Sequence, residues 1–416
     1  MLAGHGVSAV GTGLTLPFLL VYLDQVRGLD IGVAGLAIAC IGGASLVGNP
    51  VGGLLSDRVG SRNTVVLGLV LSALGTASLT LIDASWHAFA AAALVGLGAS
   101  VTWPAEDSLL ATVVRPEQRS HVFAVRFAVV NAGFGVGALI AATFVDVERP
   151  GTFEAIYLID ALSFVAYIPL LVLLLRGVGG PGPRGAAVAA GGYRAVLRDR
   201  LFVRVWLLTA LLVTVGYGQY HSSFPAYATG SGGISARALG LVFAVNTITV
   251  VVAQLVVLRL LGGRRRTRAV IGVCGLWAAT WAVTIIAGGL DGGAIAIATF
   301  ALSMIFFAVG ETFLPPALPA VVNDLASDEL RGRYNGLYIL AWTTGFIVGP
   351  AVAGIAIDAG AGTGLFVGLI VACALVAAGA IRLERVLPAA VNLIPPAQPL
   401  ESERVLEPVT SDGGAA

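Results

Sequence analysis

The chain has 416 residues, of which 57% are hydrophobic and 11% are charged, and its formal net charge is +1. Soluble domains carry about 25% charged residues, so this composition excludes an ordinary soluble protein, and the near-neutral charge excludes a basic surface for nucleic acid. All 24 basic residues are Arg, which excludes a Walker A loop because that loop needs a Lys on the phosphates. The sequence shows neither a metal-type cluster nor a nucleophile–base pair, so we expect no enzyme, no metal and no cofactor.

Twelve apolar runs of about 20 residues recur along the chain, and each is long enough to cross a bilayer as a helix. In chain order they cover residues 2–23, 32–55, 64–82, 86–110, 122–145, 154–175, 203–226, 238–261, 269–290, 293–316, 336–357 and 364–383. The first run lacks a basic leader and a small-residue cleavage site, so it predicts a span and not a signal peptide. We therefore expect an all-α protein of the lipid bilayer with 12 transmembrane helices.

The longest break between these runs divides the chain into two halves. It contains Gly179-Gly180-Pro181-Gly182-Pro183, which cannot hold a helix and predicts a flexible linker. The residues after Leu387 are Pro-rich and mildly acidic, which is typical of disorder. These features predict a six-helix bundle over residues 1–175, a cytoplasmic linker over 176–200, a second six-helix bundle over 201–385 and a disordered cytoplasmic tail over 386–416.

The Arg residues indicate how the chain lies in the membrane. Twenty of the 24 fall on the side that holds both termini, three fall on the other side, and Arg126 lies within a span. Cytoplasmic loops carry an excess of Arg and Lys, so both termini are predicted to be cytoplasmic. This pattern is typical of a multi-pass protein of the cell membrane.

The break between the second and third runs is a charged turn whose residues each have a physical role. Gly53 lets the helix end approach a neighbour closely, and Gly60 permits a tight turn. Asp57 offers a carboxylate to a helix N-terminus, while Arg58 and Arg62, four residues apart, are able to share a helical face. This loop resembles the signature loop of the major facilitator superfamily, whose members are secondary transporters. The resemblance implies two six-helix halves related by a parallel repeat, with Asp57 clamping the outward-open state through a helix end of the other half.

An internal repeat supports two related halves. A shift of 212 residues places 104–142 on 316–354, with nine identical pairs in 39 positions. Arg119, for example, falls on Arg331. A parallel duplication predicts this relation between spans four and five and spans ten and eleven.

Two stretches of small residues extend the resemblance. Span five carries a Gly-x-x-x-Gly motif at Gly133 and Gly137. Span eleven carries the same motif at Gly345 and Gly349, and Pro350 follows it directly. Both are similar to the motif of the superfamily's drug:proton antiporters, although Ala138 stands where that family has Pro. Plain helix packing also explains such residues, and this alternative stays open. The Arg that relays protons in span four of those antiporters is replaced here by Ala92.

Acids and bases inside spans are costly and are therefore candidates for functional sites. Glu106 and Asp107 end span four at the same predicted depth as Arg126 in span five, which predicts an ion pair, with Arg58 as a competing partner. These acids are either gating residues or proton carriers. Glu311 is the lone acid of span ten and our first candidate for proton coupling, with a structural role at the helix end as the alternative.

Span seven carries an aromatic and polar cluster that suits a cavity for an amphipathic ligand. Together with two Asn side chains on spans five and eight, the cavity candidates are Tyr217, Gln219, Tyr220, His221, Asn131 and Asn246. A hydrogen bond between helices explains each of them equally well on its own. Asp160, in the outer half of span six, is expected to reach the outer headgroups or a vestibule.

The resemblance to drug:proton antiporters implies export of a lipophilic drug or natural product in exchange for protons, by a monomer. Arg126 is the only base predicted inside the spans, which favours an apolar or weakly charged small molecule over a sugar phosphate or a dicarboxylate. Two alternatives stay open: an uptake permease for a small nutrient, and a non-transporting membrane sensor or assembly partner.

Overall fold

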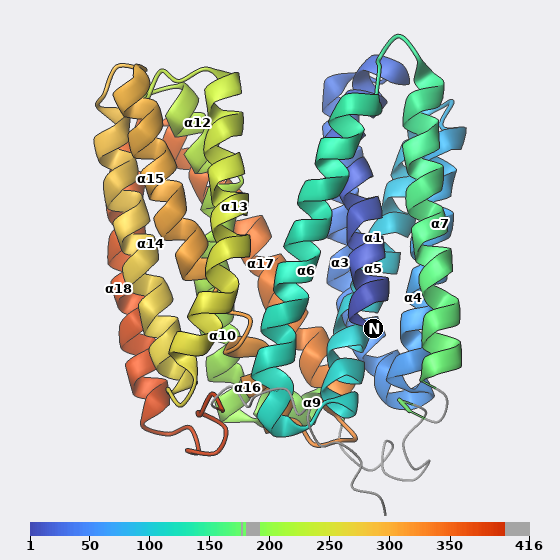
Figure 1. The fold of residues 1–416 in the computed structure, drawn as a ribbon, viewed down its shortest axis with the longest axis vertical. Coiled ribbons are helices and arrows are strands. Elements are labelled where there is room, and N and C mark those ends of the chain that lie inside the picture. The colour runs from blue at the N-terminus through green and yellow to red at the C-terminus, as the bar shows by residue number, and fades with distance from the viewer. Residues whose placement is uncertain (176–177, 180–191, 396–416) are drawn as a thin grey trace, which may run out of the picture.

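The computed structural model describes residues 1–175, 178–179 and 192–395, and every named element in these residues is a helix (Figure 1). The first half contains α1 (Leu2–Thr15), η1 (Leu16–Phe18), α2 (Leu19–Val21), η2 (Tyr22–Val26), α3 (Ile31–Val59), α4 (Ser61–Ser78), η3 (Leu79–Leu81), α5 (Ser85–Val113), α6 (Pro116–Phe144) and α7 (Pro150–Leu174). The second half contains α9 (Gly192–Arg198), α10 (Arg200–Val215), α11 (Tyr217–Tyr220), α12 (Ser223–Thr229), α13 (Ala236–Leu261), α14 (Arg266–Gly288), α15 (Ala294–Glu311), α16 (Leu318–Leu325), α17 (Arg331–Asp358) and α18 (Gly362–Glu384). Ten helical stretches of the described chain are long and apolar enough to cross a membrane. The interrupted first stretch and α13 complete the expected twelve.

Three of the expected continuous spans are interrupted. The first contains Pro17, and there the α-helix gives way to a turn of 3₁₀ helix. The seventh breaks at Gly216, between α10 and α11. A Cβ atom there would overlap the Trp277 ring, so the glycine lets the seventh span touch α14. The tenth ends at Glu311 and resumes as α16, because Pro315 and the proline after it lack the N–H groups that would continue the helix.

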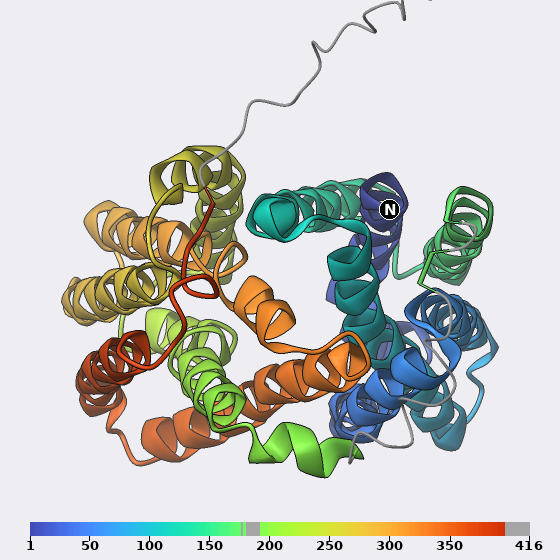
Figure 2. The ribbon, with the colours of Figure 1, turned by 90° about the horizontal axis from the view of Figure 1, so that it is seen from below.

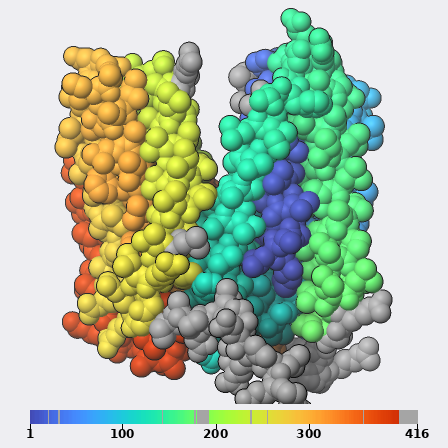
Figure 3. All heavy atoms as spheres, viewed as in Figure 1, coloured from blue at the N-terminus to red at the C-terminus, as the bar shows by residue number. Residues whose placement is uncertain are grey.

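The helices form two bundles that stand side by side, and the second view separates them clearly (Figure 2). Between the bundles, α17 packs on α3 and α5, and α13 packs on α6. We call the end that carries α9 and α16 the closed end, and the end that carries α12 the open end (Figure 1). In the space-filling view the two bundles part toward the open end (Figure 3).

The outer surface of the bundles is apolar, as a protein embedded in lipid requires. Large aliphatic side chains on several helices are more than 60% exposed; they include Leu162, Leu174, Val252, Ile355 and Leu375. Exposure of apolar side chains on this scale is not tolerated in water. The largest buried side chains, Trp277 and Trp281, lie in the continuous core of the second half.

The start of the tail differs from the expected disorder. Residues 388–395 run back along the turn between α13 and α14, where Ile394 accepts a hydrogen bond from Gly263 N (2.8 Å) and donates one to Arg264 O (2.9 Å). Asn392 binds the backbone and side chain of Thr267, and the Ile394 side chain is buried among residues of α13 and α14. Backbone pairing and burial of one large side chain therefore hold this segment in place. Residues 396–416 and most of the expected linker lie outside the described residues.

Candidate functional site

The signature loop joins the two halves at the closed end through Asp57. Its carboxylate lies at the end of α3 and accepts hydrogen bonds from Gly332 N (2.6 Å) and Arg333 N (3.1 Å) in the first turn of α17. Helix N-termini carry free N–H groups and a partial positive charge, so the carboxylate suits this position electrostatically. The Arg333 Nε atom lies 3.5 Å away and adds a second attraction.

Glycines make this contact between α3 and α17 possible. A Cβ atom on Gly53 would lie 2.5 Å from the Gly332 carbonyl oxygen, too close for any side chain. Gly60 has a φ of +92° and turns the chain from α3 into α4. This turn places Arg58 and Arg62 on different helices, so they do not share a face as expected. Arg62 instead donates to the Leu175 carbonyl oxygen at the end of α7 (3.0 Å).

A second ionic contact crosses between the halves at the closed end, and the sequence did not reveal it. Asp324 of α16 pairs with Arg119 of α6 through one oxygen and with Arg266 of α14 through the other (2.6 Å). Arg266 also donates to the Val391 carbonyl oxygen of the docked tail (2.7 Å). Arg331, the repeat partner of Arg119, likewise reaches across to Thr112 of α5 (3.4 Å). The 212-residue repeat had placed Arg119 on Arg331, but it gave no sign of their partners in the opposite half.

Arg126 is neutralised by the two acids that the sequence suggested. It pairs with Asp107 and, at 3.0 Å, with Glu106, and all three side chains are at most 8% exposed. His5 of α1 lies 2.8 Å from the Glu106 carboxylate. The guanidinium also lies 5.0 Å from the centre of the Trp103 ring, within the range of a cation–π interaction. Arg58, which was the competing candidate for these acids, lies in the last turn of α3 and is exposed.

A central cavity of about 360 Å³ lies between the halves beside this cluster. Both halves line it, with Arg126 and Asn131 on one side and Tyr217, Tyr338 and Trp342 on the other. Aromatic and aliphatic side chains make up most of the remaining wall. Small-molecule sites have this size and this mixture of apolar walls with few polar groups.

Glu311 lies at the end of α15 and is buried, with 5% of its surface exposed. Tyr217 and Asn246 face its carboxyl group, and within the described part of the chain no Arg or His pairs with it. Glu311 itself does not line the central cavity, but Tyr217 does. Tyr217 therefore connects the acid with the cavity.

The other cavity candidates divide into two groups. Asn131 lines the central cavity, and His221 lines a larger one described below. Gln219 bonds to the Gly349 carbonyl oxygen (3.0 Å) and to Ser223 (2.7 Å), so it stabilises the broken seventh span. Tyr220 bonds to Asn246 (3.3 Å) inside the second half. Sequence reasoning did not distinguish these groups, because which side of its helix a polar residue occupies depends on how the helices pack.

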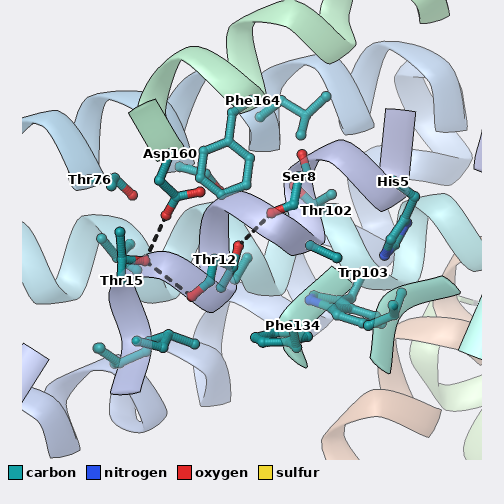
Figure 4. A pocket seen from close by; sticks show the side chains of 18 of the residues that line it. His5, Ser8, Thr12, Thr15, Thr76, Thr102, Trp103, Phe134, Asp160 and Phe164 are labelled. Atoms are coloured by element: carbon teal, nitrogen blue, oxygen red, sulfur yellow. Dashed lines mark hydrogen bonds between the residues drawn. The ribbon is translucent and has the colours of Figure 1, made fainter. Parts of the chain in front are cut away.

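A larger cavity of about 690 Å³ extends from between the halves into the interior of the first half (Figure 4). Asp160 of α7 lines it and is 2% exposed. Of the two positions expected for Asp160, the outer headgroups are excluded, because its side of α7 points into the bundle toward α1, and its place in the wall of a cavity is compatible with the vestibule. Glu154, one turn and a half earlier, pairs with Arg27 instead (2.9 Å).

The glycine motifs of spans five and eleven lie at helix crossings. Gly133 and Gly137 of α6 lie against α1, where a Cβ atom on either would overlap Ala9 or Val10. On the other half, Gly349 of α17 lies against α11, and Gly345 lies against α10. Pro350 is accommodated within α17, which continues to Asp358. These contacts agree with the helix-packing alternative.

Comparisons with known proteins agree with this architecture. The family model described as Major Facilitator Superfamily matches residues 1–309 and 233–405. The chain is 26% identical over 364 residues to the uncharacterized MFS-type transporter YqjV of Bacillus subtilis (strain 168), covering 86% of each protein. It is 27% identical over 360 residues to the multidrug resistance protein MdtH of Cronobacter sakazakii (strain ATCC BAA-894), covering 83% of this chain and 84% of that protein. A crystal structure of a bacterial homologue of the iron transporter ferroportin in an outward-facing state has a similar fold, with a TM-score of 0.76 and 18% identity over 92% of this chain and 98% of that one.

Proposed function

Since the chain belongs to the Major Facilitator Superfamily and is a multi-pass membrane transporter, we propose that it exports lipophilic compounds in exchange for protons by alternating access. Its similarity to a multidrug resistance protein over most of the chain supports this substrate class. The wall of the central cavity, which is mostly aromatic and aliphatic, suits such compounds. Arg126 offers little attraction to an anion, because two carboxylates already neutralise it.

The orientation follows from the Arg residues. Arg119, Arg266, Arg331 and Arg333 all lie at the closed end, together with the described part of the linker. The positive-inside rule assigns this end to the cytoplasm. The cavity then faces the outside, and Asp57 and Asp324 hold the cytoplasmic gate shut. The bacterial ferroportin homologue with the similar fold was likewise crystallised in an outward-facing state.

The observation that carries proton coupling is the isolation of Glu311. An acid inside a membrane protein is costly to keep charged without a partner, and no Arg or His of the described chain offers one. Glu106 and Asp107 are less suited, because Arg126 holds both in ion pairs. A proton that binds at Glu311 therefore removes a charge that no ion pair offsets, whereas at either of those acids it weakens an ion pair with Arg126.

Tyr217 provides the route from that charge to the substrate. It faces Glu311, lines both cavities and lies in α11, the short helix after the break at Gly216. A broken helix has backbone groups that are free to change partners. A change of charge at Glu311 is thus able to move the side chain that contacts the ligand.

Glu311→Gln tests the proposal, since it keeps the size and removes the proton-binding group. In proteoliposomes we expect it to abolish export against a substrate gradient when a pH gradient is imposed. Downhill exchange of substrate should survive. Glu329→Gln, the same change at an exposed acid of the same half, is the matched control and should behave as the wild type. Uphill export by the Glu311→Gln protein would place coupling elsewhere.

A further inference from the structure

The larger cavity contains an acid that the proposed mechanism does not use. Figure 4 shows Asp160 of α7 pointing toward α1, with the Phe164 ring beside it. The Thr15 hydroxyl donates a hydrogen bond to its Oδ2 atom (2.8 Å), and Ser163 donates one to Oδ1 (3.4 Å). Gly11 lies opposite, and a Cβ atom there would overlap the carboxylate. Gly11 thus makes room for this carboxyl group, and two hydroxyl groups bind it.

Asp160 has no cationic partner in the described chain. Of the two His side chains that line the cavity, His221 belongs to the second half and forms no ion pair with Asp160, and Arg62 of α4 donates to the Leu175 carbonyl oxygen. His5 of α1 lies against Glu106 of α5, Arg126 of α6 binds Glu106 and Asp107, and near the open end Arg27 binds Glu154. The cavity therefore has one acid for which the chain supplies no counter-charge.

The rest of the wall is aromatic and hydroxylic. Trp103, Phe134, Tyr157 and Phe164 line the cavity, together with several Ser and Thr residues. Aromatic faces attract cations through their quadrupole. A carboxylate in a cavity lined by aromatic side chains, with the Phe164 ring beside it, is suited to an organic ammonium or phosphonium group.

We propose that the part of the larger cavity inside the first half is a ligand site, in which Asp160 binds the cationic centre of a lipophilic organic cation. The volume of about 690 Å³ accommodates a drug-sized molecule. An inorganic divalent cation fits less well, because such ions take several carboxylate or His ligands and no group of three such side chains is found in the described residues. The inference rests on the proposed function in taking this ligand to be a transported compound.

The test uses tetraphenylphosphonium as the cation and an uncharged lipophilic dye as its neutral counterpart, with binding measured on the purified full-length protein. Asp160→Asn should weaken tetraphenylphosphonium binding by about 30-fold or more, the loss typical of removing one partner of a buried charge pair. Binding of the neutral dye should change little. Asp30→Asn, the same change at an exposed acid of the same half, should leave both affinities unaltered.

A second measurement needs no variant. A hydrophobic carbodiimide should modify Asp160 in the wild-type protein, and tetraphenylphosphonium should prevent this modification as seen by mass spectrometry of the peptide. Unchanged cation binding by Asp160→Asn, an equal loss of both probes, or protection by Mn²⁺ in place of the organic cation would each overturn the inference.

The outcome is separable from that of the proposed function. Glu311→Gln should still bind tetraphenylphosphonium, because Asp160 is unchanged, even where it no longer concentrates substrate. If proton-driven export proves absent while Asp160→Asn still loses the cation, the proposed coupling fails and this site stands.

Discussion

Asp57→Asn is the sharpest perturbation of the closed end. The carboxylate accepts two backbone N–H groups of α17, and hydrogen bonds to a charged group contribute about 1.5–3 kcal/mol each. Asn retains one acceptor oxygen but turns an NH₂ group toward the second N–H, so one bond is lost and the other becomes neutral. We estimate a loss of about 3 kcal/mol, which corresponds to a roughly 100-fold smaller preference for the closed cytoplasmic gate.

This prediction is measured by two assays on the same variant. Transport should fall almost to background while the amount of protein in the membrane stays normal. Spin labels at the repeat-related, exposed positions 117 and 329, in a protein without its three native cysteines, should report a longer distance between the halves at the closed end. Wild-type flux together with an unchanged distance distribution would show that Asp57 only anchors the loop.

The other predictions follow from burial and packing. Arg126→Met leaves two buried carboxylates without a partner and should reduce the free energy of unfolding by about 3–5 kcal/mol, seen as a lower thermal midpoint of the purified protein. Gly137→Val crowds the backbone of α1 and should cost about 1–3 kcal/mol, whereas Gly354→Val, with no atom within 4 Å of its Cβ position, should be neutral; equal midpoints would contradict the packing role. In intact cells, a membrane-impermeant thiol reagent should label a cysteine placed at Asp30 and not one at Arg198, and the reverse pattern would overturn the orientation.

The sequence predicted those features that depend on local patterns. Runs of apolar residues located all twelve spans. Gly60 indicated the turn, because a positive φ favours glycine, and Asp57 indicated the contact with a helix end, because helix N-termini favour a carboxylate. The pairing of Arg126 with the acids of α5 followed from their depth alone. The partners of Gly60 and Arg126 lie in the same loop or on consecutive helices. Asp57 binds a helix of the other half, a partner that the resemblance to the superfamily implied.

Features that depend on distant parts of the chain were not predictable in this way. In a hydropathy profile Gly216 is one position of an apolar run and gives no sign of a break. At this glycine the helix lies against the ring of Trp277, which comes 61 residues later in the chain. The inward direction of Asp160 depends on how α7 is rotated against α1. Asp324 lies in an unremarkable stretch of sequence, and its role depends on Arg119 and Arg266 arriving from two other helices.

The docking of residues 388–395 has a consequence for the order in which the protein assembles during synthesis. Residues 388–395 follow the last helix, α18. They bind Arg266, which in turn binds Asp324, the partner of Arg119 in the first half. During synthesis the helices enter the membrane before this segment has left the ribosome. The closed end is therefore completed only after the last span has been made, and a chain truncated after residue 387 has both bundles but lacks Val391, the backbone partner of Arg266.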